Sequence, residues 1–485
     1  SGMRLRLLVS TLLCLGSVLL LVLSTPLITG AFSDHAAVFS AAMLGLLLLQ
    51  AVCSYDVCLS GVIALLRFRF DQYSMLFLAL CAVVADAFFA VAEGRTPFCT
   101  VAGILLLLAL WGRDLLYDAR RRSLRAISNM DEPVAAIREE KAWHGYDCIF
   151  RAPGDAEQFA VQLEMPDAGS RIMRVWAPGM TAVTLALSVL TSLRTGEHFL
   201  WAWSAMLLAS FPAGILIAYA KPFSALARRL YRAGAAIAGW QGARILSGEA
   251  GLIVEDADLF PPQNVTLNGM KIYSDRSVSQ IIGFANAVVQ TAGSGLVPLF
   301  EEIMHNQNGR HYGVDTFRRY EGGGLGAEIR GDVILMGSLG FMKLMRVHMP
   351  EGARVKQAVY LSVNGELAAV FALSYAPATN VKACLQALAR CTGLTPILAT
   401  RDFMITPQFL KHRYKLSPDR IEFPTVEERA RLSSPAAVQE PRQGALLART
   451  GFSCFSMAVA GARAARSAAI AAIAVTYAAS VMGLL

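Results

Sequence analysis

Long apolar runs occupy both ends of the chain, and shorter apolar runs separated by polar residues lie between them. A helix needs about 20 mostly apolar residues to cross a bilayer. Seven runs approach that length, at residues 5–28, 37–66, 74–92, 98–116, 177–193, 199–220 and 468–485. Each of these runs predicts a membrane-spanning helix.

Lysine and arginine concentrate in alternate connections between these helices. One side holds Arg4, Arg6, Arg67, Arg69, Arg113 and Arg120 to Arg122. The intervening loops, 33–36 and 93–97, carry one arginine between them. Because basic residues gather in cytoplasmic loops, we expect a cytoplasmic N-terminus, with residues 117–176 and 221–466 also in the cytoplasm. From composition, we expect the inner membrane of a bacterium.

Between the last two predicted spans, strand-like runs alternate with helical segments. The predicted strands are 252–254, 358–365, 366–375 and 394–400, and the predicted helices are 380–391 and 424–434. Such alternation is typical of an α/β sheet. The pattern therefore predicts a polytopic α-helical membrane protein with a large cytoplasmic α/β unit.

Composition supports a lipid bilayer as the main partner. Of all residues, 55% are hydrophobic and 16% are charged, whereas soluble domains average about 25% charged residues. The net charge of +8 does not indicate nucleic-acid binding, because the arginines lie beside apolar segments and suit membrane anchoring. Nine cysteines without a CxxC pair indicate reduced thiols.

Candidate chemistry begins where the predicted strand 252–254 ends. The next residues include Glu255, Asp256 and Asp258. An aspartate at the tip of a strand can serve as the nucleophile in phosphoryl transfer. An exposed acidic cluster at the end of a strand is the plainer interpretation, because D-x-D is a common pattern.

In the order of its parts the chain resembles P-type ATPases, most closely the heavy-metal-transporting branch, over most of residues 40–470. The best-matched stretches are 221–250, 251–263, 314–342, 394–403 and 423–432. The resemblance implies a haloacid-dehalogenase-like P domain with an inserted nucleotide-binding-like domain.

The resemblance also implies a division of the chain into domains. These are four transmembrane helices (3–116), a reduced actuator-like insert (117–176), two transmembrane helices (177–220), an amphipathic linker with the first P-domain strand (221–263), a nucleotide-binding-like domain (264–355), the rest of the P domain (356–466) and a last transmembrane helix (467–485).

Carried over residue by residue, the catalytic motifs are degenerate. Asp256 stands at the place of the phosphorylated aspartate, but the residues after it do not match DKTGT. Thr400 and Asp402 match the outer letters of TGD, and Glu427 stands where the family has a phosphate-binding lysine. Residues 443–455, at the place of the Mg²⁺-binding GDGxNDxP, contain no acidic residue.

These losses predict a catalytically inactive membrane scaffold, sensor or regulator that needs no cofactor and could have a protein partner. The actuator motif TGE is also absent from the insert at 117–176. Two alternatives remain. One is an ATP-driven cation pump phosphorylated on Asp256 with Mg²⁺ and ATP. The other is a membrane-tethered phosphatase that uses Asp256 as nucleophile and Asp258 as general acid.

The nucleotide-binding-like domain keeps a glycine-rich hairpin. Gly322, Gly324 and Gly326 resemble the family's GxG, where absent side chains let adenine approach the backbone. A simple turn is the alternative. The His-Pro pair expected near 293–303 is replaced by Leu-Val-Pro, which favours weak or no ATP binding.

In the membrane part, Lys221-Pro222-Phe223 stands where the family has its metal-binding CPC. Pro222 is expected to unwind the helix, but neither sulfur is present. Asp56 and Asp86 lie within apolar runs, and intramembrane carboxylates are candidates for an ion path. Alternatively, Asp56 marks a break near a helix end.

Overall fold

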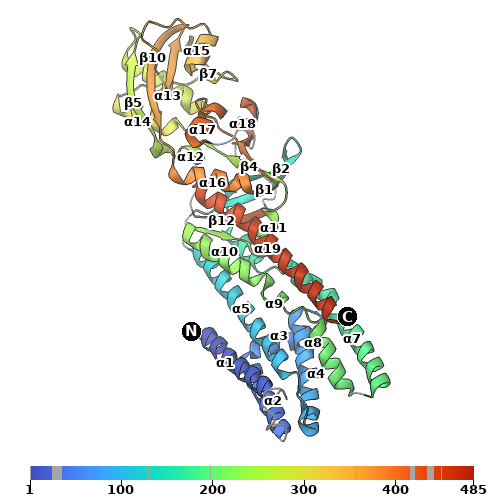
Figure 1. Cartoon of the computed structure of the whole chain (residues 1–485). Coiled ribbons are helices and arrows are strands. Elements are labelled where there is room, and N and C mark those ends of the chain that lie inside the picture. Colours follow the sequence, from blue (N-terminus) through green and yellow to red (C-terminus); the bar gives the residue numbers. More distant parts are fainter. Residues whose placement is uncertain are drawn as a thin grey trace.

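The computed structural model of the chain describes residues 2–24, 35–128, 130, 132–196, 198–355, 357–415, 421–433, 442–448 and 451–484. The end of the first predicted span (25–28), the start of the loop at 33–36 and Leu485 lie outside these ranges. The molecule is elongated, with a bundle of long helices at one end and the two sheets towards the other (Figure 1).

Seven helical segments among the described residues are long and apolar enough to cross a membrane. They comprise α1 (Gly2–Leu23), α2 (Ala36–Cys53), α4 (Gln72–Glu93), α5 (Cys99–Ser128), α7 (Ala168–Thr195), the run of α8 (Phe199–Ser210), α9 (Ile215–Ala218) and α10 (Ala220–Ala233), and α19 (Phe452–Leu484). These segments confirm the predicted polytopic membrane protein.

Two predicted spans are interrupted. The span at 37–66 breaks at Ser54, after which α3 (Tyr55–Leu66) continues. The span at 199–220 breaks at 211–214, because Pro212 has no N–H with which to extend α8. The Ser210 carbonyl at this break accepts hydrogen bonds from Trp176 and Ser480 of neighbouring helices. The surrounding bundle thus satisfies a carbonyl that ends α8.

The prediction that Pro222 unwinds a membrane helix is wrong. Pro222 lies in the first turn of α10, where proline costs no intrahelical hydrogen bond. The proline at the break is Pro212. Its neighbours in the chain, Phe211 and Ala213, carry no thiol.

The first sheet has the strand order β11-β4-β2-β1-β12-β3. The strands are β11 (Leu394–Leu398), β4 (Ala250–Val254), β2 (Tyr146–Pro153), β1 (Val134–Trp143), β12 (Arg442–Leu447) and β3 (Ala235–Ile237). β4 runs parallel to both β11 and β2, and the remaining pairs are antiparallel.

The β1–β2 hairpin comes from residues 117–176, for which the resemblance implies a reduced actuator-like insert. In the structure it forms two central strands of the first sheet, because Cys148 and Ile149 pair with Gly251 and Leu252 of β4. The hairpin also pairs with β12 on its other side. The insert is therefore part of the sheet that carries Asp256.

The second sheet is antiparallel, in the order β5-β10-β9-β8-β7-β6. The strands are β5 (Val265–Ile272), β10 (Glu366–Tyr375), β9 (Ala358–Val363), β8 (Asp332–Gly337), β7 (Gly324–Ile329) and β6 (Thr316–Tyr320), with α13 (Val278–Ala292), α14 (Val297–Asn306) and α15 (Leu339–Leu344) in the same unit. Since β10 pairs with β5, this unit ends after Tyr375 and not at residue 355.

The remaining helices are α6 (Ala156–Leu163), α11 (Gly239–Ile245), α12 (Asp256–Leu259), α16 (Thr379–Arg390), α17 (Pro407–Tyr414) and α18 (Val426–Leu432), besides a 3₁₀ turn at Pro262–Asn264. α16 and α18 match the two helices predicted in this region. α19 begins at Phe452 within the cytoplasmic unit, earlier than the predicted span at 468–485, and continues into the bundle (Figure 1). One buried cluster joins Leu252, Phe371 and Phe455, so both sheets and α19 share a core.

Candidate functional site

The acidic cluster after β4 forms the start of a short helix. All five residues of β4 are buried, and α12 begins at Asp256 directly after it. Glu255 and Asp258 cap this helix reciprocally, and the Glu255 backbone N–H donates to Asp258 Oδ2 at 2.8 Å. Asp256 and Asp258 are both buried. The cluster is therefore an interior feature and not an exposed strand end.

The Asp256 carboxylate accepts hydrogen bonds from three backbone N–H groups. The donors are Gly295 at 3.0 Å, Arg401 at 3.1 Å and Asp402 at 3.4 Å. A Cβ atom built on Gly295 would lie 2.8 Å from the Asp256 Cβ. The loop between α13 and α14 thus lies directly against Asp256, and an incoming phosphate could reach this carboxylate only after these contacts separate.

Asp402 is the second carboxyl group of this site. It accepts hydrogen bonds from the Tyr375 hydroxyl at 2.7 Å and from the Met404 N–H at 2.8 Å. Burial, and then the charge of Asp402, raise the pKa of Asp256, and burial also raises the pKa of Asp402. Two neighbouring buried carboxyl groups favour a state in which one of them is protonated.

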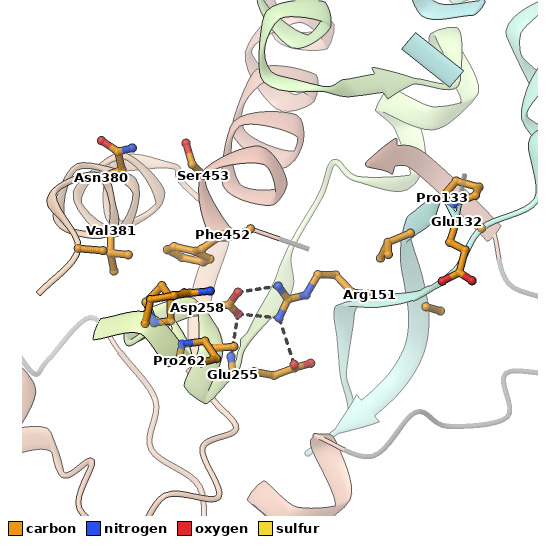
Figure 2. A pocket seen from close by; sticks show the side chains of 18 of the residues that line it. Glu132, Pro133, Arg151, Glu255, Asp258, Pro262, Asn380, Val381, Phe452 and Ser453 are labelled. Carbon is orange, nitrogen blue, oxygen red and sulfur yellow. Dashed lines mark hydrogen bonds and ion pairs between the residues drawn. The ribbon is translucent and has the colours of Figure 1, made fainter. Parts of the chain in front are cut away.

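Asp258 forms a buried ion pair with Arg151 of β2. Arg151 Nη1 and Nη2 lie 2.5 and 2.7 Å from the two carboxylate oxygens, and Nη2 also lies 3.2 Å from Glu255 (Figure 2). Burial raises the pKa of Asp258 to about 6, and the Arg151 charge opposes that rise. At neutral pH Asp258 is an ionised, paired group, a state that does not suit a general acid.

A cavity of about 990 Å³ opens beside this pair, between the β1–β2 hairpin and the start of α19. Its lining includes Arg151, Glu255, Asp258, Pro262, Asn380 and Phe452 (Figure 2). Sequence reasoning did not find Arg151. It lies 107 residues from Asp258 in the chain, and only the pairing of β2 with β4 brings the two together.

The carboxylates of this site do not fit a Mg²⁺ ion. Asp256 accepts three N–H groups, Asp402 accepts a hydroxyl and an N–H group, and Asp258 is paired with Arg151. Mg²⁺ requires carboxylate or water oxygens around it. β12 lacks an acidic residue and is separated from β4 by the hairpin. Among the residues that the structure describes, no group of three His, Cys, Asp or Glu side chains could hold a metal.

A second cavity, of about 360 Å³, lies between the glycine-rich hairpin and the loop after β11. It brings together Gly322, Gly324 and Thr400 from the predicted positions, with Arg319, Arg401 and Arg429 beside them. Glu427 is exposed in the first turn of α18, whereas Arg429 is buried and lies 3.5 Å from the Thr400 hydroxyl. An arginine thus lies beside Thr400, whereas Glu427, at the place of the family's lysine, is exposed.

Packing explains most of the glycine pattern. A Cβ atom on Gly324 would overlap the Phe341 ring, and one on Gly326 would lie 2.9 Å from the Tyr320 ring. Gly323, between them, has a φ of +81°, which other residues rarely adopt. Gly326 does not line the cavity. The hairpin therefore needs glycine in order to fold, with or without a nucleotide.

The two membrane aspartates are separately paired. Asp56 forms ion pairs with Arg6 and, at 3.6 Å, with Arg113, at the end of the bundle predicted to be cytoplasmic. Asp86 is fully buried and lies 2.5 Å from Arg95, which belongs to an opposite-side loop. The structure therefore does not bring them into one path. Asp56 does lie beside the break at residue 54, as the alternative interpretation predicts.

Comparisons with family models and with curated proteins found no match. Solved structures do match. A zinc-transporting PIB-type ATPase in an E2.Pi state aligns over 100% of both chains with 14% identity and a TM-score of 0.45. A second structure of a zinc-transporting PIB-type ATPase aligns over 99% of both chains with 13% identity and a TM-score of 0.43.

Two catalytic fragments are also similar. The N-domain of a copper-transporting P-type ATPase covers 23% of this chain and 99% of its own, with 18% identity and a TM-score of 0.21. The catalytic domain of a CPx-ATPase covers 41% of this chain and 70% of its own, with 11% identity and a TM-score of 0.26. All four are named as PIB-type, P-type or CPx-ATPases or parts of them, and with TM-scores below 0.5 and identities of 11–18% they assign no role to this chain.

Proposed function

We propose that this chain is a P-type ATPase-like membrane protein that forms no aspartyl phosphate and acts as a scaffold, sensor or regulator. The observation that carries the proposal is the closed state of Asp256, whose carboxylate accepts the Gly295, Arg401 and Asp402 N–H groups. N–H groups engage most of the lone pairs of a carboxylate held in this way, and attack on phosphorus requires that these contacts first separate.

The chemistry around Asp256 supports the same proposal. Phosphoryl transfer relies on Mg²⁺ and cations that neutralise the transferring group. The donor set here does not fit Mg²⁺, and Glu427 replaces a lysine with a carboxylate. Arg429 supplies a positive charge near Thr400, but it cannot take over the role of the metal.

Acid-stable incorporation of γ-phosphate from labelled ATP tests the proposal on purified protein in detergent with Mg²⁺. We expect the wild-type protein to incorporate no more label than Asp256→Asn. Asp275→Asn, which changes an exposed aspartate of the same unit, is the matched control. Label present in the wild type and the control but absent from Asp256→Asn contradicts the proposal.

An ATP-driven cation pump is the second candidate, because Asp256 still lies at the end of β4 and a broken helix, α8–α9, lies in the membrane part. Its signature would be phosphorylation of Asp256 that depends on a particular metal ion. Titrating zinc, copper and other divalent cations in the labelling experiment separates it from the first candidate.

The phosphatase candidate depends on Asp258 as a proton donor. The bidentate contact with Arg151 disfavours that role, since it holds Asp258 ionised. Hydrolysis of p-nitrophenyl phosphate that Asp258→Asn abolishes would establish this activity.

A further inference from the structure

A cavity of about 210 Å³ lies at the end of the helix bundle that is predicted to be cytoplasmic. Its wall is formed by the start of α4, the middle of α5, the connection between α6 and α7, and Tyr219 between α9 and α10. Each of these membrane helices contributes residues near the end of its apolar run. The cavity therefore lies at the depth of the lipid headgroups, and it shares no residue with the site around Asp256.

The wall of this cavity carries both signs of charge in equal number. Its charged residues are Arg113, Arg120, Glu164 and Asp167. Because two arginines stand with two carboxylates, their charges sum to zero. A ligand with one sign of charge is repelled by half of these groups, whereas a zwitterion can place an opposite charge against each half.

Two of these charged residues already have partners within the protein. Arg113 lies 3.6 Å from Asp56, and the Asp167 carboxylate caps α7. Arg120 and Glu164 differ from them, because neither side chain forms an ion pair or a hydrogen bond with any residue that the structure describes. One arginine and one carboxylate of this wall are thus available to a ligand.

A donor and an acceptor in the same wall are buried without a hydrogen-bond partner among the described residues. They are Nη1 of Arg113 and Oε1 of Gln72. Buried polar atoms normally have a partner, and leaving one unpaired costs about 1–3 kcal/mol. A ligand that suits this wall must therefore accept from Arg113 and donate to Gln72.

We propose that this cavity binds the headgroup of a phospholipid that carries a primary ammonium group, as phosphatidylethanolamine does. The phosphate accepts from Arg113 and Arg120, and the ammonium group donates to Gln72 and Glu164. The cavity has the volume of about seven waters at about 30 Å³ each, which is enough for phosphoethanolamine. The proposal does not involve Asp256 and goes beyond the proposed function.

The surroundings of the cavity favour a membrane lipid over a soluble phosphate ester. Tyr73 and Tyr117 line it, and tyrosine is enriched at the level of the headgroups. Ser170 of α7 also lines it, and α7 continues into the bundle with exposed apolar side chains at Ile172 and Val175. These side chains offer the acyl chains of a bound lipid an apolar surface.

Native mass spectrometry of the full-length protein in detergent, titrated with dioctanoyl phospholipids, tests this site. Phosphatidylethanolamine should bind as one saturable adduct, about tenfold more tightly than phosphatidylcholine or phosphatidylglycerol, the worth of a charged hydrogen bond. The choline nitrogen has no N–H group to donate, and the glycerol headgroup has no positive charge.

Two variants separate the two halves of the headgroup. Glu164→Gln should weaken the binding of phosphatidylethanolamine about tenfold and leave the weaker binding of phosphatidylglycerol unchanged. Arg120→Gln should weaken both lipids, because both carry the phosphate. Glu157→Gln and Arg121→Gln change exposed residues outside the cavity and should bind as the wild type does. A merely structural role of Glu164 would weaken all lipids alike, which would overturn the proposal.

Three further results would also overturn it. These are no binding of phosphatidylethanolamine, equal binding of the three lipids without saturation, and competition by soluble glycerophosphoethanolamine as strong as that by the lipid. If Glu164→Gln does not fold, Arg120→Gln against Arg121→Gln decides the question. Asp256→Asn should keep lipid binding, which distinguishes failure of this site from failure of the proposed function.

Discussion

Arg151 on β2 contacts both carboxylate oxygens of Asp258, at 2.5 and 2.7 Å, across the junction of β2 with β4. The Asp258 side chain is 1% exposed and that of Arg151 is 9% exposed. The β1–β2 hairpin thus supplies the arginine that keeps Asp258 ionised, whereas the phosphatase candidate requires Asp258 as a proton donor.

Arg151→Met should strongly destabilise the cytoplasmic unit. It leaves Asp258 buried without a counter-charge, a change that costs about 3–5 kcal/mol in other buried pairs. The melting temperature measured in detergent should therefore be much lower than that of the wild type. The double variant with Asp258→Asn should recover much of it, because it removes the stranded charge.

Arg442→Met is the matched control for this prediction. Arg442 lies on β12 of the same sheet and pairs with Glu140, and both side chains are 70% exposed. Exposed pairs contribute little, so its melting temperature should stay near that of the wild type. An equal fall in melting temperature in both variants would show that the buried pair contributes no more to stability than the exposed pair does.

The stability of the protein should fall as pH rises from about 4 to about 7. The ordinary pKa of an aspartate is about 3.9, and burial together with Asp402 raises the pKa of Asp256 to about 7 in the folded protein. The folded state therefore holds a proton that the unfolded chain releases. This stabilisation is complete below about pH 4 and is lost as pH passes about 7.

Asp256→Asn should flatten that decline, because the amide does not titrate. Melting temperatures between pH 5 and 8 for this variant, the wild type and Asp275→Asn measure the effect. The exposed Asp275 control should keep the wild-type slope. Parallel slopes in all three proteins would mean that Asp256 is not the group responsible.

Gly295→Ala should destabilise the contact between the two sheet units. The new Cβ would lie 2.8 Å from the Asp256 Cβ, and overpacking of this kind costs about 1–3 kcal/mol. Limited proteolysis should cut this variant faster around residues 293–296. Gly269→Ala is the control, since a Cβ there meets no atom within 4 Å.

Asp86→Asn should lower the stability of the membrane bundle. Asp86 is fully buried and takes two hydrogen bonds from Arg95, at 2.5 and 3.1 Å. Removing one partner of a buried pair costs about 3–5 kcal/mol. Size-exclusion profiles after heating should therefore lose the monodisperse peak at a lower temperature.

Glu93→Gln gives the comparison, because Glu93 contacts the same Arg95 at 2.7 Å from a partly exposed position. We expect its profile to follow that of the wild type. A stable Asp86→Asn would instead favour a functional role for this carboxyl group.

The sequence predicted what depends on local patterns. The apolar runs predicted the membrane segments, and the alternating pattern predicted β10 at residues 366–375. The reciprocal cap of Glu255 and Asp258 carries no such signal, because the usual pattern has serine or threonine first and glutamate or glutamine three residues later. The break at Pro212 could have been predicted, since Ser-Phe-Pro-Ala-Gly interrupts an apolar run.

The rest depends on contacts between distant parts of the chain. Neither periodicity nor composition indicates that β2 pairs with β4, and without that pairing Arg151 has no visible role. The same holds for the second cavity, whose arginines come from β6, the loop after β11 and α18. Motif comparison singled out Glu427 on α18, because an aligned position does not tell which side of the helix faces the cavity.

The place of the β1–β2 hairpin has a mechanical consequence. The chain enters it from α5 and leaves it through α6 to α7, so two membrane helices are fastened to the middle strands of a sheet. Moving the hairpin out of the sheet would break its hydrogen-bonded pairing with β4 and with β12 at the same time. A movement of the first sheet is therefore transmitted to these helices as a translation or a tilt. The hairpin cannot rotate independently of the sheet, as a separately hinged domain could.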